Sequence, residues 1–264
     1  MLELRDVTKT FYPGTVNEKR ALSHLQLCIE DGDFVTVIGG NGAGKSTLLN
    51  MICGVFPVDA GSILLNGKEL KDMPEYRRAA FLGRVFQDPM MGTAANMEIE
   101  ENLAFALRRG KRRGLGWGIR EEERAMYREK LSRFDLGLEN RMHAKVGLLS
   151  GGQRQALTLL MATLRRPELL LLDEHTAALD PKTAQKVLRL TEELIAENKL
   201  TTLMITHNMK DAIRFGNRLI MMDAGRVIYD VRGEEKARLR VEDLLRLFEE
   251  RAETHTATDR MMLG

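Results

Sequence analysis

The chain has 264 residues, of which 44% are hydrophobic and 30% are charged, and its formal net charge is +2. This is the composition of an ordinary globular protein, and so small a net charge decides neither for nor against nucleic acid. No run of about eighteen apolar residues occurs and charges stand close to Met1, so we expect neither a membrane span nor a secretory signal. Cys28 and Cys53 lie in apolar surroundings and predict two structural thiols of a reduced cytosolic protein.

The first part of the chain is predicted to be rich in β-structure. Leu2–Thr8 and Leu25–Ile29 alternate apolar and polar residues, which is typical of strands with one buried face. The apolar, β-branched run Phe34–Ile38 is typical of a buried parallel strand. Further on, Asn66-Gly67 follows another apolar run and indicates a tight hairpin. We therefore expect an early β-rich subdomain.

The segment Gly39–Thr47 follows the Phe34–Ile38 strand and precedes a helical pattern. Its glycines let successive backbone N–H groups turn toward one anion, and the helix N-terminus adds a partial positive charge. The spacing matches a phosphate loop, in which Lys45 reaches the β- and γ-phosphates and the hydroxyl of Ser46 binds Mg²⁺. The residues predicted to hold the nucleotide here are Gly39, Asn41, Gly42, Ala43, Gly44, Lys45, Ser46 and Thr47.

From about residue 96 to residue 165 the pattern is helical, and strands then alternate with helices. The periodicity predicts helices over Glu98–Leu107 and Glu121–Phe134, and Ser150 is a candidate N-cap for a helix that runs to Leu164. The remaining predicted elements are the strand Leu169–Leu172, the helix Lys182–Asn198, the strand Leu203–Ile205, a hairpin over Leu219–Ile228, a last helix around Val241–Phe248 and a loose tail over Thr254–Gly264. This alternation predicts an α/β core with a parallel sheet.

Two acidic residues stand where a phosphate-loop enzyme needs them. Asp173 and Glu174 end an apolar strand, so Asp173 is placed to bind Mg²⁺ and Glu174 to polarise the attacking water as a general base. A second anion-binding element is Ser150–Gln153, because Gly151 and Gly152 leave N–H groups uncovered at a helix start. Two such elements in one chain suggest that two chains share the nucleotide.

These features resemble the ATP-binding subunits of ABC transporters over roughly residues 1–232. The most specific match is Leu149–Gln153, which is similar to the signature motif of that family. The other matches follow in the family's order: Gln87 resembles the Q-loop glutamine, Leu169–Glu174 the Walker B motif, Asp180 the D-loop and His207 the switch histidine. The usual Pro-Thr-Ser after the glutamate is replaced by His175-Thr-Ala, which leaves a local role for His175 open.

The resemblance implies an ABC ATPase fold. This is a phosphate-loop NTPase core with a parallel sheet, an N-terminal antiparallel β subdomain and an all-helical subdomain inserted at about residues 90–165. Residues 1–232 would form the ATPase domain, and residues 233–264 a C-terminal helix and loose tail.

The resemblance also implies a head-to-tail homodimer with ATP and Mg²⁺ at the interface. The phosphate loop of one subunit would face the partner's signature residues Ser150, Gly151, Gly152 and Gln153. Asp180 would lie at the dimer seam, and His207 would contact the γ-phosphate and hold Glu174. Gln87 would complete a Mg²⁺ site with Ser46 and Asp173. Phe11, with Tyr12 as the alternative, would stack on adenine, because an aromatic ring suits a base face.

The resemblance implies that separate integral-membrane permease subunits hold the protein at the cytoplasmic face of the cell membrane. The stretches Phe86–Asn102 and Asp173–Asp180 resemble a bacterial subgroup that works with branched-chain-amino-acid-like permeases and a substrate-binding lipoprotein. That suggests uptake of an amino acid, aromatic amino acids included, or of another small solute. The alternatives are an export or lipoprotein-extraction engine and a non-transport regulatory ABC ATPase.

A basic, glycine-rich stretch, Arg108–Arg120, holds six basic residues, four glycines and no acid. It is either a solvated loop or a contact to anionic lipid headgroups or an acidic permease loop, with Trp117 at the interface. Nucleic-acid binding is not expected, because stacking aromatics do not accompany the charges.

Overall fold

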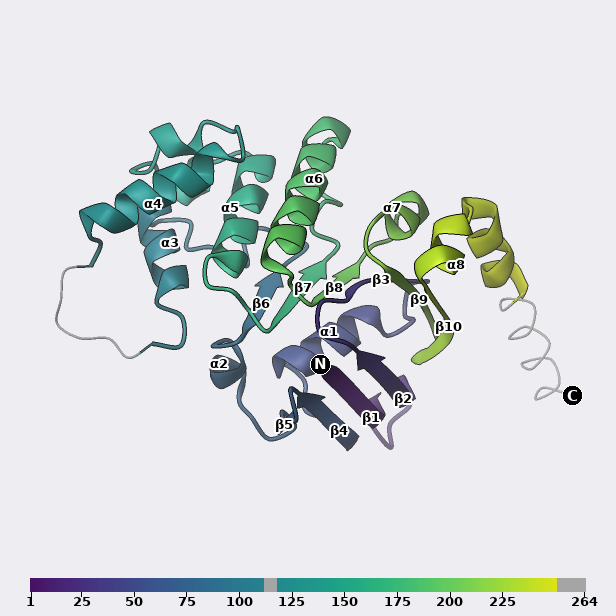
Figure 1. Cartoon of the computed structure of the whole chain (residues 1–264). Coiled ribbons are helices and arrows are strands. Elements are labelled where there is room, and N and C mark those ends of the chain that lie inside the picture. Colours follow the sequence, from purple (N-terminus) through teal and green to yellow (C-terminus); the bar gives the residue numbers. More distant parts are fainter. Residues whose placement is uncertain (112–117, 251–264) are drawn as a thin grey trace, which may run out of the picture.

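The structure is a computed structural model that describes residues 1–111 and 118–250. The described chain contains a four-stranded sheet and a six-stranded sheet, with helix α1 (Lys45–Cys53) lying between them (Figure 1). Within these residues no helix is long and apolar enough to cross a membrane. The predicted tail from Thr254 lies outside the described residues, as does Trp117 of the basic stretch.

The antiparallel sheet has the strand order β2-β1-β4-β5 and confirms the predicted early β-rich region. Its strands are β1 (Leu2–Phe11), β2 (Lys19–Ile29), β4 (Ala60–Leu65) and β5 (Lys68–Glu69). Asn66 and Gly67 join β4 to β5 with φ values of 51° and 78°, and positive φ at both positions is what a tight I′ hairpin requires. Cys53 is buried as predicted, but Cys28 is exposed, because strand alternation places it on the outer face of β2.

The larger sheet has the order β10-β9-β3-β8-β7-β6. Its strands are β3 (Phe34–Gly39), β6 (Leu82–Val85), β7 (Leu169–Asp173), β8 (Thr202–Ile205), β9 (Arg218–Asp223) and β10 (Arg226–Arg232). All are parallel except β10, which pairs antiparallel with β9. The parallel order brings the carboxyl ends of β3, β6, β7 and β8 to one edge, where the sequence places the phosphate loop, Gln87, the acidic pair and His207.

The helices are α1, α2 (Glu75–Arg78), α3 (Ile99–Leu107), α4 (Glu121–Ser132), α5 (Gly151–Thr163), α6 (Pro181–Asn198), α7 (Met209–Arg214) and α8 (Gly233–Arg238). Two 3₁₀ turns, η1 (Leu138–Asn140) and η2 (Val146–Leu148), precede α5, and residues 241–250 are helical. The sequence analysis did not predict α7 and α8, because six residues are too few to display helical periodicity.

Helices α3 and α4 lie on one side of the molecule, away from the antiparallel sheet (Figure 1). Their buried residues Leu103 and Tyr127 share one core with Leu157 of α5 and with Leu170 and Leu172 of β7. This core is continuous between the helices and the large sheet. The domain boundaries near residues 90, 165 and 232 therefore stay predictions.

Arg78 is 2% exposed and ties α2 to the end of α1. Its guanidinium donates hydrogen bonds to the carbonyls of Met51 and Met73 at 2.7 Å, and to that of Ile52 at 3.0 Å. The carbonyls of Met51 and Ile52 lie in the last turn of α1, where a helix lacks N–H partners of its own.

We expect Arg78→Ala to lower the free energy of unfolding by about 2–4 kcal/mol, because buried carbonyls lose their donors. Urea titration followed by circular dichroism measures the change. Arg77→Ala is the matched control, since Arg77 is exposed and should cost under about 0.5 kcal/mol. Equal effects of the two substitutions would contradict this role of Arg78.

Candidate functional site

The loop between β3 and α1 is held from outside by backbone. A Cβ on Gly39 would lie 2.4 Å from the carbonyl oxygen of Met222, and one on Gly44 would lie 2.5 Å from that of Ala21. Gly44 is also the N-cap residue of α1, with φ at 98°. These positions therefore require glycine for packing, and at Gly44 also for conformation.

The start of α1 offers the loop's free backbone donors. Gly44 provides no side-chain cap, and the first turn of α1 holds no acidic residue. The first N–H groups of a helix have no acceptor within it, and they carry the positive end of its dipole. Ser46 is exposed and Thr47 half-buried at this end, so the arrangement is open to an anion.

Lys45 points back across the loop. Its ammonium donates hydrogen bonds to the carbonyls of Gly39 at 2.7 Å and Gly40 at 3.0 Å. Burial lowers the pKa of Lys45, while the charges of Glu174 and Asp173 oppose this shift. Lys45 thus interacts both with the carbonyls of the loop and with the charges of the acidic pair at the end of β7.

The three other residues predicted for catalysis and the predicted metal ligand Asp173 converge on this edge. Glu174 has a positive φ of 44°, and its Oε2 accepts a hydrogen bond from Nε2 of Gln87 at 3.4 Å. The same oxygen lies 3.4 Å from Nδ1 of His207. Asp173 precedes Glu174, and burial raises the pKa of Asp173, whereas Arg84 opposes the rise. The structure thus brings Lys45, Asp173, Glu174, Gln87 and His207 together, although they come from four separate segments.

The predicted magnesium ligands fit a hard cation. Ser46 offers a hydroxyl at an exposed position, Asp173 a carboxylate and Gln87 an exposed amide oxygen. Oxygen donors of this kind are what Mg²⁺ takes in proteins, usually together with substrate phosphates and water. The electrostatic influence of Asp173 on Lys45 places that carboxylate beside the phosphate loop.

Two charged residues at the site were missed by the sequence analysis. Nζ of Lys19 on β2 would lie 3.4 Å from a Cβ on Gly42, so this exposed ammonium borders the phosphate loop. A lysine at the exposed start of a strand carries no pattern that could have predicted this position. Arg84 on β6 lies 3.5 Å from Oδ2 of Asp173. Its charge inside a short buried strand was a signal that the sequence analysis did not use.

The predicted second anion-binding element caps α5 in the structure. The hydroxyl oxygen of Ser150 accepts from the N–H of Gln153 at 3.3 Å, and the Gln153 side chain accepts from the N–H of Ser150 at 3.1 Å. This reciprocal capping box confirms Ser150 as the N-cap. The N–H groups of Gly151 and Gly152 lie in the first turn of α5, where a helix offers them no carbonyl acceptor, so they can donate hydrogen bonds to a bound anion.

The two signature glycines differ in what requires them. A Cβ on Gly152 would lie 2.1 Å from Cγ2 of Thr183, so glycine is needed there for the packing of α5 on α6. A Cβ on Gly151 would only make an ordinary 3.6 Å contact with Leu179. No positive φ occurs at Gly151 either, so the fold itself leaves this glycine unexplained.

Asp180 caps α6 by accepting a hydrogen bond from the N–H of Thr183 at 3.1 Å, and hydrogen bonds from Thr183 lower the pKa of Asp180.

The two aromatic residues predicted to stack on adenine lie at the end of β1. Phe11 is half-buried and meets the ring of Phe56 edge to face, with 5.1 Å between the ring centroids. Tyr12 is 69% exposed with φ at 52°. Phe11 therefore has the fixed ring, whereas Tyr12 leaves the sheet.

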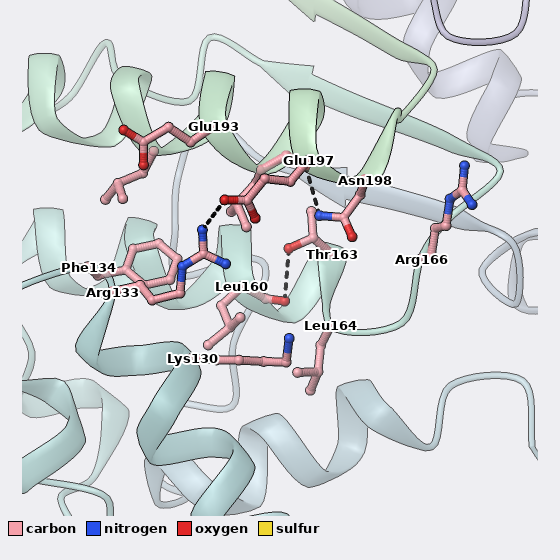
Figure 2. A pocket seen from close by; sticks show the side chains of 12 residues that line it. Lys130, Arg133, Phe134, Leu160, Thr163, Leu164, Arg166, Glu193, Glu197 and Asn198 are labelled. Atoms are coloured by element: carbon pink, nitrogen blue, oxygen red, sulfur yellow. Dashed lines mark hydrogen bonds and ion pairs between the residues drawn. The ribbon is translucent and has the colours of Figure 1, made fainter.

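The cleft in Figure 2, which is lined by both charged and apolar side chains, lies elsewhere, between α4, α5 and α6. Its volume is about 240 Å³, and an ion pair between Arg133 and Glu197, 2.5 Å long, crosses it. No residue predicted for the nucleotide site lines this cleft. A smaller cavity of about 140 Å³ does adjoin Glu174 and His207.

Comparison with known proteins identifies the family of this chain. The family model described as ABC transporter matches residues 22–177, more than half of the chain. The chain belongs to the ABC transporter family. It is an ATP-binding subunit of this class, and the domain that it contains hydrolyses ATP.

Among curated relatives, a tyrosine transport ATP-binding protein of Clostridioides difficile is 44% identical over 94% of this chain and 99% of its own length. A lipoprotein-releasing system ATP-binding protein of Caulobacter vibrioides is 35% identical over 88% of this chain and 96% of its own. Among solved structures, the dimeric ATP-binding cassette MJ0796 bound to ADP and Pi is 32% identical, with a TM-score of 0.76 over 88% of this chain and 98% of that one. These likenesses confirm the predicted ABC ATPase fold.

His175, which follows Glu174, is 2% exposed. Its Nε2 lies 3.2 Å from the hydroxyl of Thr191 on α6, and that hydroxyl donates to the carbonyl of Val187 at 2.8 Å. The hydroxyl oxygen is therefore the acceptor, and Nε2 of His175 carries the proton. Burial lowers the pKa of His175 to about 4, so the imidazole is neutral at physiological pH.

Because the folded state holds His175 neutral, the unfolded state binds more protons between about pH 4 and pH 6.5. We expect the free energy of unfolding to fall as pH drops through this window, by up to about 3 kcal/mol. Urea unfolding in EDTA at several pH values measures the slope. The His175→Gln variant should have a shallower slope, and an unchanged slope would contradict the assignment.

Proposed function

We propose that this ATPase works as a head-to-tail dimer in which each ATP lies between the phosphate loop of one subunit and Ser150–Gln153 of its partner. The proposal is supported by the two separate anion-binding elements, each with free helix N–H groups. Gly151 supports it further, since neither packing nor φ within the chain accounts for that glycine. The relative MJ0796 is a dimer in its structure with ADP and Pi, which supports dimerisation.

The convergence of charged groups at the edge of the large sheet carries the proposed mechanism. Glu174, held by Gln87 and His207, polarises the attacking water as the general base. Lys45 stabilises charge on the transferring phosphoryl group, together with the N–H groups of α1 and the partner's α5. Ser46, Asp173 and Gln87 would hold Mg²⁺, which when bound neutralises phosphate charge.

For the adenine ring, we favour Phe11 over Tyr12. Phe11 pairs in register with Lys19, whose ammonium borders Gly42 of the phosphate loop. A ring at that register lies beside the loop, and its packing on Phe56 fixes its plane. Asp180 would meet the partner at the dimer seam while capping α6.

For the transported solute, we propose uptake of tyrosine or a related aromatic amino acid through separate permease subunits at the cytoplasmic face of the membrane. The support is the Clostridioides difficile relative, which matches 94% of this chain at 44% identity. A permease similar to branched-chain amino-acid permeases and a substrate-binding lipoprotein would complete the system. Lipoprotein release is the second candidate, supported by the Caulobacter vibrioides relative at 35% identity.

Glu174→Gln should keep ATP binding but lower the turnover number by at least about a hundred-fold, because the general base is lost. The variant should also accumulate as a dimer with ATP. Phosphate release and size-exclusion chromatography with ATP measure the two effects. Turnover close to that of the wild type would place the base elsewhere.

A mixing experiment tests the shared site directly. Lys45→Ala should abolish activity at the loop, and Ser150→Arg should abolish it at the partner's element, so each variant alone is inactive. In a mixed dimer one of the two sites holds both defects and the other holds none. Mixing the two proteins should therefore restore part of the ATPase activity, whereas no restoration would contradict the head-to-tail arrangement.

In cells that express the chain with its own permease, we expect uptake of radiolabelled tyrosine that Glu174→Gln abolishes. Leucine uptake in the same cells is the control for solute class. Release of lipoproteins from membrane vesicles, without tyrosine uptake, would favour the second candidate instead.

A further inference from the structure

Arg84 places a cation beside the carboxylate that is proposed to bind Mg²⁺. Nη2 of Arg84 lies 3.5 Å from Oδ2 of Asp173, and both side chains are 14% exposed. The two residues stand on the adjacent parallel strands β6 and β7, where Arg84 pairs in register with Leu171. Because Asp173 lies two residues after Leu171, sheet pairing places the two side chains on the same face of neighbouring strands.

The guanidinium is held in place by more than this one pair. Its carbon lies 4.4 Å from the ring centroid of Phe86, a cation–π distance. Its Nε is buried and has no hydrogen-bond partner among the described residues. Arg84 also opposes the rise in pKa that burial causes in the Cys53 thiol, so it lies close to α1.

Such an arrangement is costly for a purely structural residue. Replacing a buried ion pair by apolar side chains often leaves stability unchanged or increases it. Here one donor nitrogen is left unsatisfied, which adds to the cost. Stability of the fold therefore does not explain why a charged residue occupies position 84, and a functional role for the charge of Arg84 would explain it.

Mg²⁺ and Arg84 would share one carboxylate. The guanidinium contacts Oδ2 of Asp173, so Oδ1 would be available to Mg²⁺. The guanidinium opposes the rise in the pKa of Asp173 that burial causes, and it orients the carboxylate, but it also repels a second cation at the same group. The ring that it stacks on, Phe86, directly precedes Gln87.

We propose that Arg84 is a positioning residue that acts as the resident counter-ion of Asp173 and sets the Mg²⁺ concentration at which the subunit binds nucleotide. This inference rests on the proposed role of Asp173 as a metal ligand. Arg84 neutralises part of the charge of Asp173, and Mg²⁺ would supply part of that neutralisation when bound. Because Arg84 stacks on Phe86, its guanidinium lies near the segment that carries Gln87.

The test is a Mg²⁺ titration of fluorescent ATP-analogue binding to the full chain, in the Glu174→Gln background so that hydrolysis does not interfere. Arg84→Gln should lower the half-saturating Mg²⁺ concentration roughly ten-fold, because the repulsion is lost. Arg84→Lys keeps the charge and should leave the half-saturating concentration close to that of the background. Binding in EDTA and thermal unfolding are recorded for each variant.

A purely structural role would lower the melting temperature without moving the Mg²⁺ half-saturation, and that result overturns the proposal. An equal shift in Arg84→Lys and Arg84→Gln also overturns it, since charge would then not matter. If Arg84→Gln does not fold, Arg84→Met provides a second neutral side chain that can still pack on Phe86. Asp173→Asn in the same assay distinguishes failure of the Arg84 proposal from failure of the proposed metal role of Asp173. If the Mg²⁺ dependence of Asp173→Asn is unchanged, Asp173 is not a metal ligand.

Discussion

The close approach of backbone to the phosphate loop is the constraint on which the rest of the site depends. The carbonyl of Met222 on β9 and that of Ala21 on β2 come so near to Gly39 and Gly44 that no side chain fits. The N–H of Gly225 also donates to the carbonyl of Ala43 at 3.1 Å. Backbone atoms of both sheets thus contact the loop, so the fold itself fixes the shape of the loop. A preorganised donor set needs little reorganisation when charge develops on the substrate.

The same edge of the sheet gathers charges that would repel or neutralise one another elsewhere. Lys45 interacts with both members of the acidic pair, and Arg84 neutralises Asp173 from the neighbouring strand. Glu174 instead faces Gln87 and His207, which come from two further segments. Apart from Lys45, the two acidic residues have different partners although they are adjacent in sequence, so each can serve a different chemical step.

The signature helix is linked to this edge through the core. Gln155 on α5 is fully buried and donates from Nε2 to the carbonyl of Phe86 at 3.1 Å. The ring of Phe86 in turn stacks on the guanidinium of Arg84, and Phe86 directly precedes Gln87. Packed and hydrogen-bonded groups therefore join α5 to the acidic pair. Contiguous contacts of this kind can carry energetic coupling between two sites.

The sequence by itself determined the element types and most of the site residues, because both depend on local patterns. Alternation predicted the strands, and the glycine spacing at Gly39–Thr47 predicted the loop. The cap at Ser150 and the hairpin at Asn66-Gly67 followed from single-residue preferences and are present in the structure. These features need no knowledge of distant contacts, since their causes lie within a few residues.

Only the tertiary structure decided which side chains meet across strands. Lys19 and Arg84 reach the site through sheet pairing and packing, and nothing in their immediate sequence specifies their neighbours. Cys28 is exposed because of which face of β2 it occupies. The requirement for glycine at Gly152 depends on Thr183, which lies on another helix. Contacts of this kind depend on the order of strands and the packing of helices, which a single sequence does not state residue by residue.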